Sequence, residues 1–150
     1  MKSILSFVSL FFVIYIYGQN NYKQIPSEKL SEQKIQLTKN FIQTYLTKCE
    51  NKNYTEFSNF NLATEHKKFM DKNLTEICQN DEKNFGKINL NKFNSAYKNK
   101  SSLVGGNELY IFDANTEKDK NIKYLSVWIS KENQIDGMVI TDYKPLKKRK

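Results

Sequence analysis

The spacing of the apolar residues changes near Gly86, and this change limits the possible folds more than any other feature of the sequence. Before Gly86, in segments 27–50 and 61–79, apolar residues recur every three or four positions, as on one face of an amphipathic helix. After Gly86 they alternate with polar residues, which is typical of half-buried strands. Helices that precede a run of strands predict an α+β domain, not alternating α/β units.

Two helices, with a short extra helical turn at 54–57, account for the first half of the domain. Ser27 is the predicted N-cap of the first helix, because it follows Pro26 and precedes an acidic residue. The core stripe of this helix contains Leu30, Leu37, Phe41, Tyr45 and Cys49. The second helix presents one face with Leu62, His66, Phe69, Met70, Leu74, Ile77 and Cys78. The polar segment 80–86 is predicted to end the helical half.

The second half predicts a curved sheet of four antiparallel strands, at 87–97, 108–114, 122–130 and 135–143. Within the first strand the apolar residues change parity, which predicts a β-bulge near Lys92. Gly137 predicts a bulge or a close backbone contact in the last strand. In the third strand Leu125, Val127 and Ile129 share one face, and Tyr124, Ser126 and Trp128 share the other. The sequence leaves open which of these faces packs on the helices.

The first 19 residues have the three-part pattern of a secretory signal peptide, with a basic start, an apolar run and a small residue before a polar segment. The apolar run of 14 residues is shorter than the roughly 20 that span a membrane. Cleavage is expected near Gly18 or Gln19, so the mature protein would be periplasmic or secreted and would keep no membrane span. A polar leader at 20–26, one domain at 27–143 and a basic tail at 144–150 follow.

The chain contains two cysteines, Cys49 and Cys78. In an exported protein an even number of cysteines predicts a disulfide, and two buried free thiols are the alternative. Each cysteine lies on the core stripe of a predicted helix, so packing the helices antiparallel would bring the sulfurs together. The spacing fits no metal motif, and His66 is the one histidine; we therefore expect neither a metal nor a cofactor.

The formal net charge of +8 invites a nucleic-acid interpretation, but the kind of basic residue argues against it. Of the 24 basic residues only Arg149 is an arginine, the side chain best suited to bidentate phosphate and guanine recognition. We therefore expect no nucleic-acid partner. The tail at 144–150 is interpreted as solvated, with contact to an anionic membrane surface or polymer as the alternative.

Few residues stand out as candidates for chemistry. His66 is either a core histidine on an apolar helix face or a general base, and Tyr124 and Trp128 are either core residues or the lining of a ligand cavity. Three acids near strand ends are interpreted as turn or solvent residues, with an inward orientation as the alternative: Asp113, Asp136 and Asp142.

The order of the elements and three short patterns resemble a known superfamily. The patterns are ENKNYTEF at 50–57, FGKI at 85–88 and LSVWISKENQIDGM at 125–138. Over residues 30–143 the chain resembles small exported bacterial members of the nuclear transport factor 2-like superfamily. The resemblance implies a strongly curved sheet wrapped around helices, which forms a cone with a mouth, and it implies a homodimer. Enzymes of this superfamily carry acids, histidine or tyrosine inside the cone, and no such set matches here.

Three functions are compatible with these observations. The first is a non-enzymatic exported domain that binds a small ligand or a partner protein in or on the cone. The second is a cone-pocket enzyme of the dehydratase or isomerase type that uses His66 with an acid or a tyrosine. The third is an envelope-associated structural module with a basic surface. The sequence identifies neither the ligand nor the partner.

Overall fold

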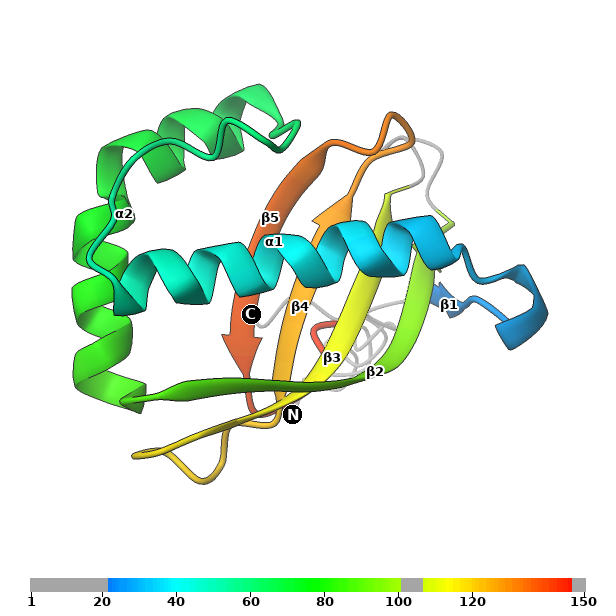
Figure 1. Cartoon of the computed structure of the whole chain (residues 1–150). Helices are drawn as coiled ribbons and strands as arrows, with labels where there is room; N and C mark the ends of the chain where they lie inside the picture. The colour runs from blue at the N-terminus through cyan, green and yellow to red at the C-terminus, as the bar shows by residue number, and fades with distance from the viewer. Residues whose placement is uncertain (1–21, 101–106, 147–150) are drawn as a thin grey trace, which may run out of the picture.

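The computed structural model describes residues 22–100 and 107–146, and the predicted signal peptide lies outside them. In the described part the helices precede all but one of the strands (Figure 1). The elements are β1 (Tyr22–Gln24), a 3-10 turn (Ser27–Lys29), α1 (Glu32–Glu50), α2 (Thr64–Phe85), β2 (Ile88–Asn99), β3 (Glu108–Thr116), β4 (Tyr124–Ile129) and β5 (Ile135–Thr141). The predicted α+β class is therefore confirmed.

The five strands form one antiparallel sheet in the order β1-β2-β3-β4-β5, with β1 and β5 at the two edges. The sequence predicts four of these strands. The fifth, β1, falls in the segment predicted to be a polar leader, and Lys23 at its centre pairs with Lys98 of β2. Its three residues are too few and too polar to show the alternation that marks a strand.

Both helices differ from the sequence prediction, and the short helical turn predicted at 54–57 is not present. Ser31, not Ser27, is the N-cap of α1, and its hydroxyl accepts a hydrogen bond from the backbone N–H of Lys34. The turn at Ser27–Lys29 occupies the predicted start, and an extended Leu30 separates it from the helix. At the other end, α2 continues through the polar segment 80–85, because a residue distant in sequence satisfies its last carbonyls.

That residue is Lys118, whose ammonium group donates to the carbonyls of Glu82 and Lys83. The chain then reverses at Gly86, which has φ +64°. A β-carbon at this position would lie 2.8 Å from Oε2 of Glu117, so the turn requires both the backbone freedom and the small size of glycine. The loop between β3 and β4 therefore fixes where α2 ends and β2 begins.

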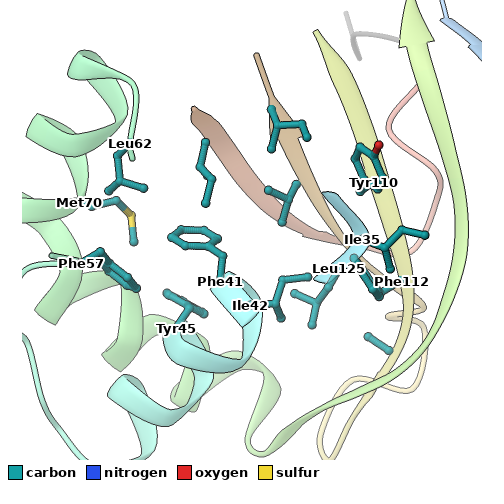
Figure 2. Packing of buried hydrophobic residues seen from close by; sticks show 14 of the residues in the cluster. Ile35, Phe41, Ile42, Tyr45, Phe57, Leu62, Met70, Tyr110, Phe112 and Leu125 are labelled. Atoms are coloured by element: carbon teal, nitrogen blue, oxygen red, sulfur yellow. The ribbon is translucent and has the colours of Figure 1, made fainter. Parts of the chain in front are cut away.

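The core lies between α1, α2 and one face of the sheet. Phe41, Ile42 and Tyr45 of α1 are fully buried there, and Phe57 and Met70 pack around them (Figure 2). In β4 the residues that belong to this core are Leu125, Val127 and Ile129. The face that carries Tyr124 and Trp128 is therefore turned away from the helices, which decides the question that the sequence left open.

Irregularities occur in both strands where the sequence predicts them. The register of β2 against β3 shifts between Leu90 and Ser95, which confirms the bulge near Lys92. In β5, Trp128 pairs with Gly137 while the next residue of β4 pairs with Ile135, so Asp136 is an extra residue. These bulges bend the sheet around α1 at two places.

Candidate functional site

A disulfide joins the end of α1 to the second half of α2. Cys49 and Cys78 are 29 residues apart in sequence, and their Cα atoms lie 5.1 Å apart. The bond predicted from the cysteine count is thus confirmed. Closing a loop of this length stabilises the fold by about 3 kcal/mol, mainly by restricting the unfolded chain. Disulfides are typical of oxidising compartments, which agrees with a location outside the cytoplasm.

One helical turn away, a hydrogen bond forms a second link between the same helices. Tyr45 precedes Cys49 by four residues, and Asp81 follows Cys78 by three, so each side chain lies about one helical turn from the disulfide. The Tyr45 hydroxyl donates to Oδ2 of Asp81. The tyrosine is 1% exposed, and the carboxyl group is half-buried.

These two links form part of a cleft with a volume of about 250 Å³, which we call the disulfide cleft. It lies where the end of α1, the second half of α2 and the beginning of β2 meet. Its apolar lining consists mainly of Leu46, Ile88 and the disulfide, and Asp81 provides a carboxyl group. Lys52, Lys87, Glu50 and Glu82 also line it, so its charged residues are of mixed sign.

Burial changes the acid–base properties of the tyrosine–aspartate pair. Burial raises the pKa of Asp81, and the hydrogen bond from Tyr45 lowers it in part. Burial, followed by the charge of Asp81 and the hydrogen bond to it, raises the pKa of Tyr45 far above neutral pH. The tyrosine therefore stays a hydrogen-bond donor, while Asp81 is a carboxyl group with a perturbed pKa in a concave site. This combination is typical of ligand-binding and catalytic sites.

His66 lies on the first turns of α2 and contacts the aromatic core, outside the disulfide cleft. Its ring centroid is 6.2 Å from that of Phe41. Burial lowers the pKa of His66, and its Nε2 atom has no hydrogen-bond partner among the described residues. These contacts favour the interpretation as a neutral core histidine.

Tyr124 and Trp128 lie on the sheet face that is turned away from the helices, so the structure does not bring them near His66. The indole N–H of Trp128 donates to the hydroxyl of Tyr22 at 3.1 Å. The ammonium group of Lys144 lies 5.9 Å from the centre of the Tyr124 ring. Their predicted role in lining a ligand cavity stays a prediction, and it concerns the outer face of the sheet.

Of the three strand-end acids, two are held by asparagine side chains. The Asn94 amide donates to Asp113, and the Asn107 amide donates to Asp136. Burial, and to a lesser degree the charge of Glu132, raise the pKa of Asp136. The third acid, Asp142, directly follows β5. The hydrogen bonds to Asp113 and Asp136 favour structural roles within the sheet.

Sequence reasoning missed the Tyr45–Asp81 pair, although a usable signal was present. Tyr45 was assigned to the core stripe, and Asp81 to the segment that ends the second helix. If Cys49 and Cys78 are assumed to pair, the residue four before one and the residue three after the other each lie one helical turn from the disulfide, which makes them candidates for a contact.

Among residues 22–100 and 107–146, no helix has both the length and the apolar character needed to cross a membrane. The same residues contain no group of three or more histidine, cysteine, aspartate or glutamate side chains that could hold a metal ion. Comparison with protein-family models, with curated proteins and with solved structures finds no match for the chain.

Proposed function

We propose that the protein is a non-enzymatic, exported binding domain whose disulfide cleft takes a small, largely apolar ligand with one hydrogen-bond donor. The observation that carries this proposal is the buried Tyr45–Asp81 pair beside an apolar wall. Small-molecule sites are typically concave and mostly apolar, with a few polar groups that orient the ligand. The volume of about 250 Å³ suits a single ring or a short chain.

The free oxygen of Asp81 defines the polar group of the ligand. Oδ2 accepts the Tyr45 hydroxyl, and no described side chain donates to Oδ1. A hydroxyl, amine or amide N–H of the ligand would fill this position. A half-buried carboxylate without a basic partner gains stability from an added donor. The apolar part of the ligand would then contact Leu46, Ile88 and the disulfide.

A binding role is favoured over the dehydratase or isomerase alternative by the position of His66. That alternative needs His66 beside an acid or a tyrosine hydroxyl, since a general base must be within hydrogen-bond reach of its proton. His66 contacts the Phe41 ring instead, and its Nε2 atom has no partner among the described residues. Among the described residues no histidine lines the cleft with Asp81, which supports binding better than turnover of this type.

The proposal also covers the fold family and the oligomeric state. The two helices that precede the β2–β5 meander, with α1 lying across one sheet face, support a relationship to the nuclear transport factor 2-like superfamily. A homodimer through the outer sheet face would follow from that relationship. Light scattering coupled to size-exclusion chromatography measures the mass in solution, and a monomer at micromolar concentration would exclude the dimer.

The cleft can be tested with simple probes. In an NMR titration of the oxidised protein, phenol and benzylamine should shift the backbone amide signals of Leu46 and Ile88, while toluene, which has no donor, should bind more weakly. Leu46→Trp fills the cleft and should abolish these shifts. Asp81→Asn should remove the preference for benzylamine over toluene. Glu76→Gln changes an exposed acid on the same helix and is the matched control.

Two outcomes would contradict the proposal. The first is an absence of shifts at the cleft with all three probes at millimolar concentration. The second is an equal response of the wild-type protein and the Leu46→Trp variant, because the probes would then bind elsewhere.

A further inference from the structure

A second cavity lies at the opposite end of α1 from the disulfide cleft, and its lining is strongly basic. It has a volume of about 590 Å³ and lies between β1, the end of β2, the start of β3 and the first turn of α1. We call it the lysine cavity, after its lining residues Lys23, Lys29, Lys34, Lys98 and Lys100. Among the described residues of the lining Glu108 is the only acid, which leaves these residues a net formal charge of +4.

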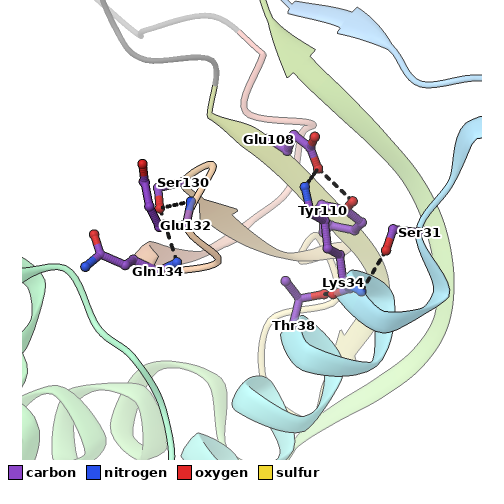
Figure 3. Close-up of polar contacts among 8 residues, drawn as sticks. All are labelled: Ser31, Lys34, Thr38, Glu108, Tyr110, Ser130, Glu132 and Gln134. Carbon is purple, nitrogen blue, oxygen red and sulfur yellow. Dashed lines mark hydrogen bonds and ion pairs between the residues drawn. The ribbon is translucent and has the colours of Figure 1, made fainter.

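The one carboxylate of the lysine cavity is already occupied. Oε2 of Glu108 accepts the ammonium group of Lys34 at 2.9 Å and the hydroxyl of Tyr110 at 2.9 Å (Figure 3). The side chains of Lys34 and Glu108 are 24% and 16% exposed, so this ion pair is largely shielded from water. Within the described part of the chain, no carboxylate lies at ion-pair distance from the other four lysines.

The pairing of the strands places charged residues of the cavity side by side in one row across the sheet. Lys23 of β1 lies directly opposite Lys98 of β2, and Lys98 lies directly opposite Glu108 of β3. Like charges at directly opposed positions destabilise a sheet. A lysine on an edge strand discourages that strand from pairing with another protein chain. Lys23 of β1 would be enough for this protection, so it does not explain why a second lysine, Lys98, lies opposite Lys23. An anion held between the two ammonium groups would remove the repulsion.

We propose that the lysine cavity binds a small molecule that carries two or more phosphate or sulfate groups. A lysine ammonium is a compact point charge whose donors rotate freely, and it binds phosphate groups through its charge, without the bidentate geometry that arginine offers. The described residues contain no arginine. The N-terminal turn of α1 borders the cavity through Ser31 and adds partial positive charge.

The size and shape of the cavity favour a soluble ligand over a membrane surface. A volume of about 590 Å³ is within the range of small-molecule sites. Its lysines come from β1, β2, α1 and the segments next to them, and all five line the same cavity. Gln24 and Ser31 offer neutral polar groups to the rest of the ligand. Phosphate headgroups of a lipid surface offer the same chemistry, so the experiment must separate the two sources.

The test compares two double variants that lose the same net charge. Lys23→Gln/Lys98→Gln neutralises the opposed pair, and Lys72→Gln/Lys131→Gln neutralises two exposed lysines outside the cavity. The probe is tripolyphosphate, titrated calorimetrically into the oxidised protein. We expect the cavity variant to bind about tenfold or more weakly, since each lost ammonium removes a charged hydrogen bond. The control variant should bind like the wild-type protein, and all affinities should fall as salt rises.

Thermal unfolding without ligand separates binding from stability. Because the Lys23–Lys98 repulsion is removed, the cavity variant should unfold at the same or a higher temperature than the wild-type protein. Weaker binding by a protein that is not less stable would support the proposal. A lower unfolding temperature together with unchanged tripolyphosphate affinity would overturn it, because the lysines would then be structural.

Three further results would overturn the proposal. Equal weakening in both variants would indicate diffuse attraction by the net charge. No binding of tripolyphosphate by the wild-type protein at millimolar concentration would exclude a phosphate site. Binding to vesicles of equimolar phosphatidylglycerol and phosphatidylcholine that is lost only in the cavity variant, without tripolyphosphate binding, would identify a membrane surface as the partner. None of these results depends on the disulfide cleft.

Discussion

The two ends of α1 carry the same chemical pair in different electrostatic surroundings. At the end of the helix the Tyr45 hydroxyl donates to Asp81, and beside its first turn the Tyr110 hydroxyl donates to Glu108. Glu108 also has the counter-ion Lys34, whereas Asp81 has no basic partner among the described residues. Burial therefore raises the pKa of Asp81. Both carboxylates accept a tyrosine hydroxyl, but only Glu108 also has a counter-ion that balances its charge. Asp81 has none among the described residues and is left available to a ligand.

The residues around the Tyr45–Asp81 pair are also less charged than those around the Tyr110–Glu108 pair. Beside Asp81 the helices are joined covalently and the cleft wall is largely apolar. Beside Glu108 the contact between helix and sheet is ionic, and further lysines surround it. The first region should therefore depend on redox conditions and little on salt, and the second should depend on salt. Four experiments would break or sharpen this comparison.

The largest effect is expected from removing the disulfide. Cys49→Ala/Cys78→Ala should lower the free energy of unfolding by about 3 kcal/mol, because the unfolded chain regains the freedom of an open loop. Urea unfolding measures the change, and the wild-type protein kept under a reductant provides a second measurement. A loss below about 1 kcal/mol would mean that the helices hold each other without the bond.

A smaller effect should follow from removing the counter-ion at the other end. Lys34→Met leaves Glu108 partly buried without its ionic partner and should cost about 1 to 2 kcal/mol. Urea unfolding at low and at high salt should show that the variant has lost part of the salt dependence of the wild-type protein. Lys72→Met, at an exposed position, is the control, and an equal change in both variants would argue against a specific ion pair.

The hydrogen bond of the cleft should contribute about 1 kcal/mol. Tyr45→Phe removes the donor to Asp81 and keeps the buried ring. Because this hydrogen bond lowers the pKa of Asp81, the pKa should rise further in the variant. Carbon-13 NMR titration of the carboxyl group measures the shift, and Tyr54→Phe is the matched control. An unchanged Asp81 titration would show that the hydrogen bond does not form in solution.

The smallest expected effects are changes in stability with pH, and the contributions of His66 and Asp81 have opposite signs. The folded pKa of His66 is below 6.5, so the unfolded state binds more protons below that pH and stability falls as pH decreases. The folded pKa of Asp81 is above 3.8, so the folded state binds more protons just above that pH and stability rises as pH decreases.

Unfolding free energies measured from neutral to acidic pH should separate these two contributions. His66→Gln should remove the loss that begins near pH 6.5, and Asp81→Asn should remove the gain at lower pH. A wild-type pH profile that neither substitution changes would contradict both assignments.

Local patterns predicted much of the fold because they depend on neighbours in sequence. The periodicity of Phe41 and Tyr45 predicted α1, and the alternation of Leu125, Val127 and Ile129 predicted β4. The parity change near Lys92 predicted a bulge. In contrast, α2 was predicted too short, since Lys118 stabilises its last turn from a distant loop.

The candidate sites could be predicted only in part. The even number of cysteines led to the disulfide, and the Tyr45–Asp81 contact one helical turn away was overlooked. The lysine cavity could not be found in the same way, because Lys23 belongs to a strand without a sequence signal. Its position opposite Lys98 exists only once β1 pairs with β2.

The sequence by itself determined the α+β class, most of the buried faces of the two helices and the partners of the disulfide, because periodicity and cysteine number can be read along the chain. One residue of those faces was predicted wrongly, since Phe69 is 53% exposed. Only the tertiary structure decided which face of β4 meets the helices, which carboxylates meet tyrosine hydroxyls, and which lysines share a cavity. These outcomes depend on burial and on the approach of charges that are distant in sequence, and both arise only when the sheet and the helices pack together.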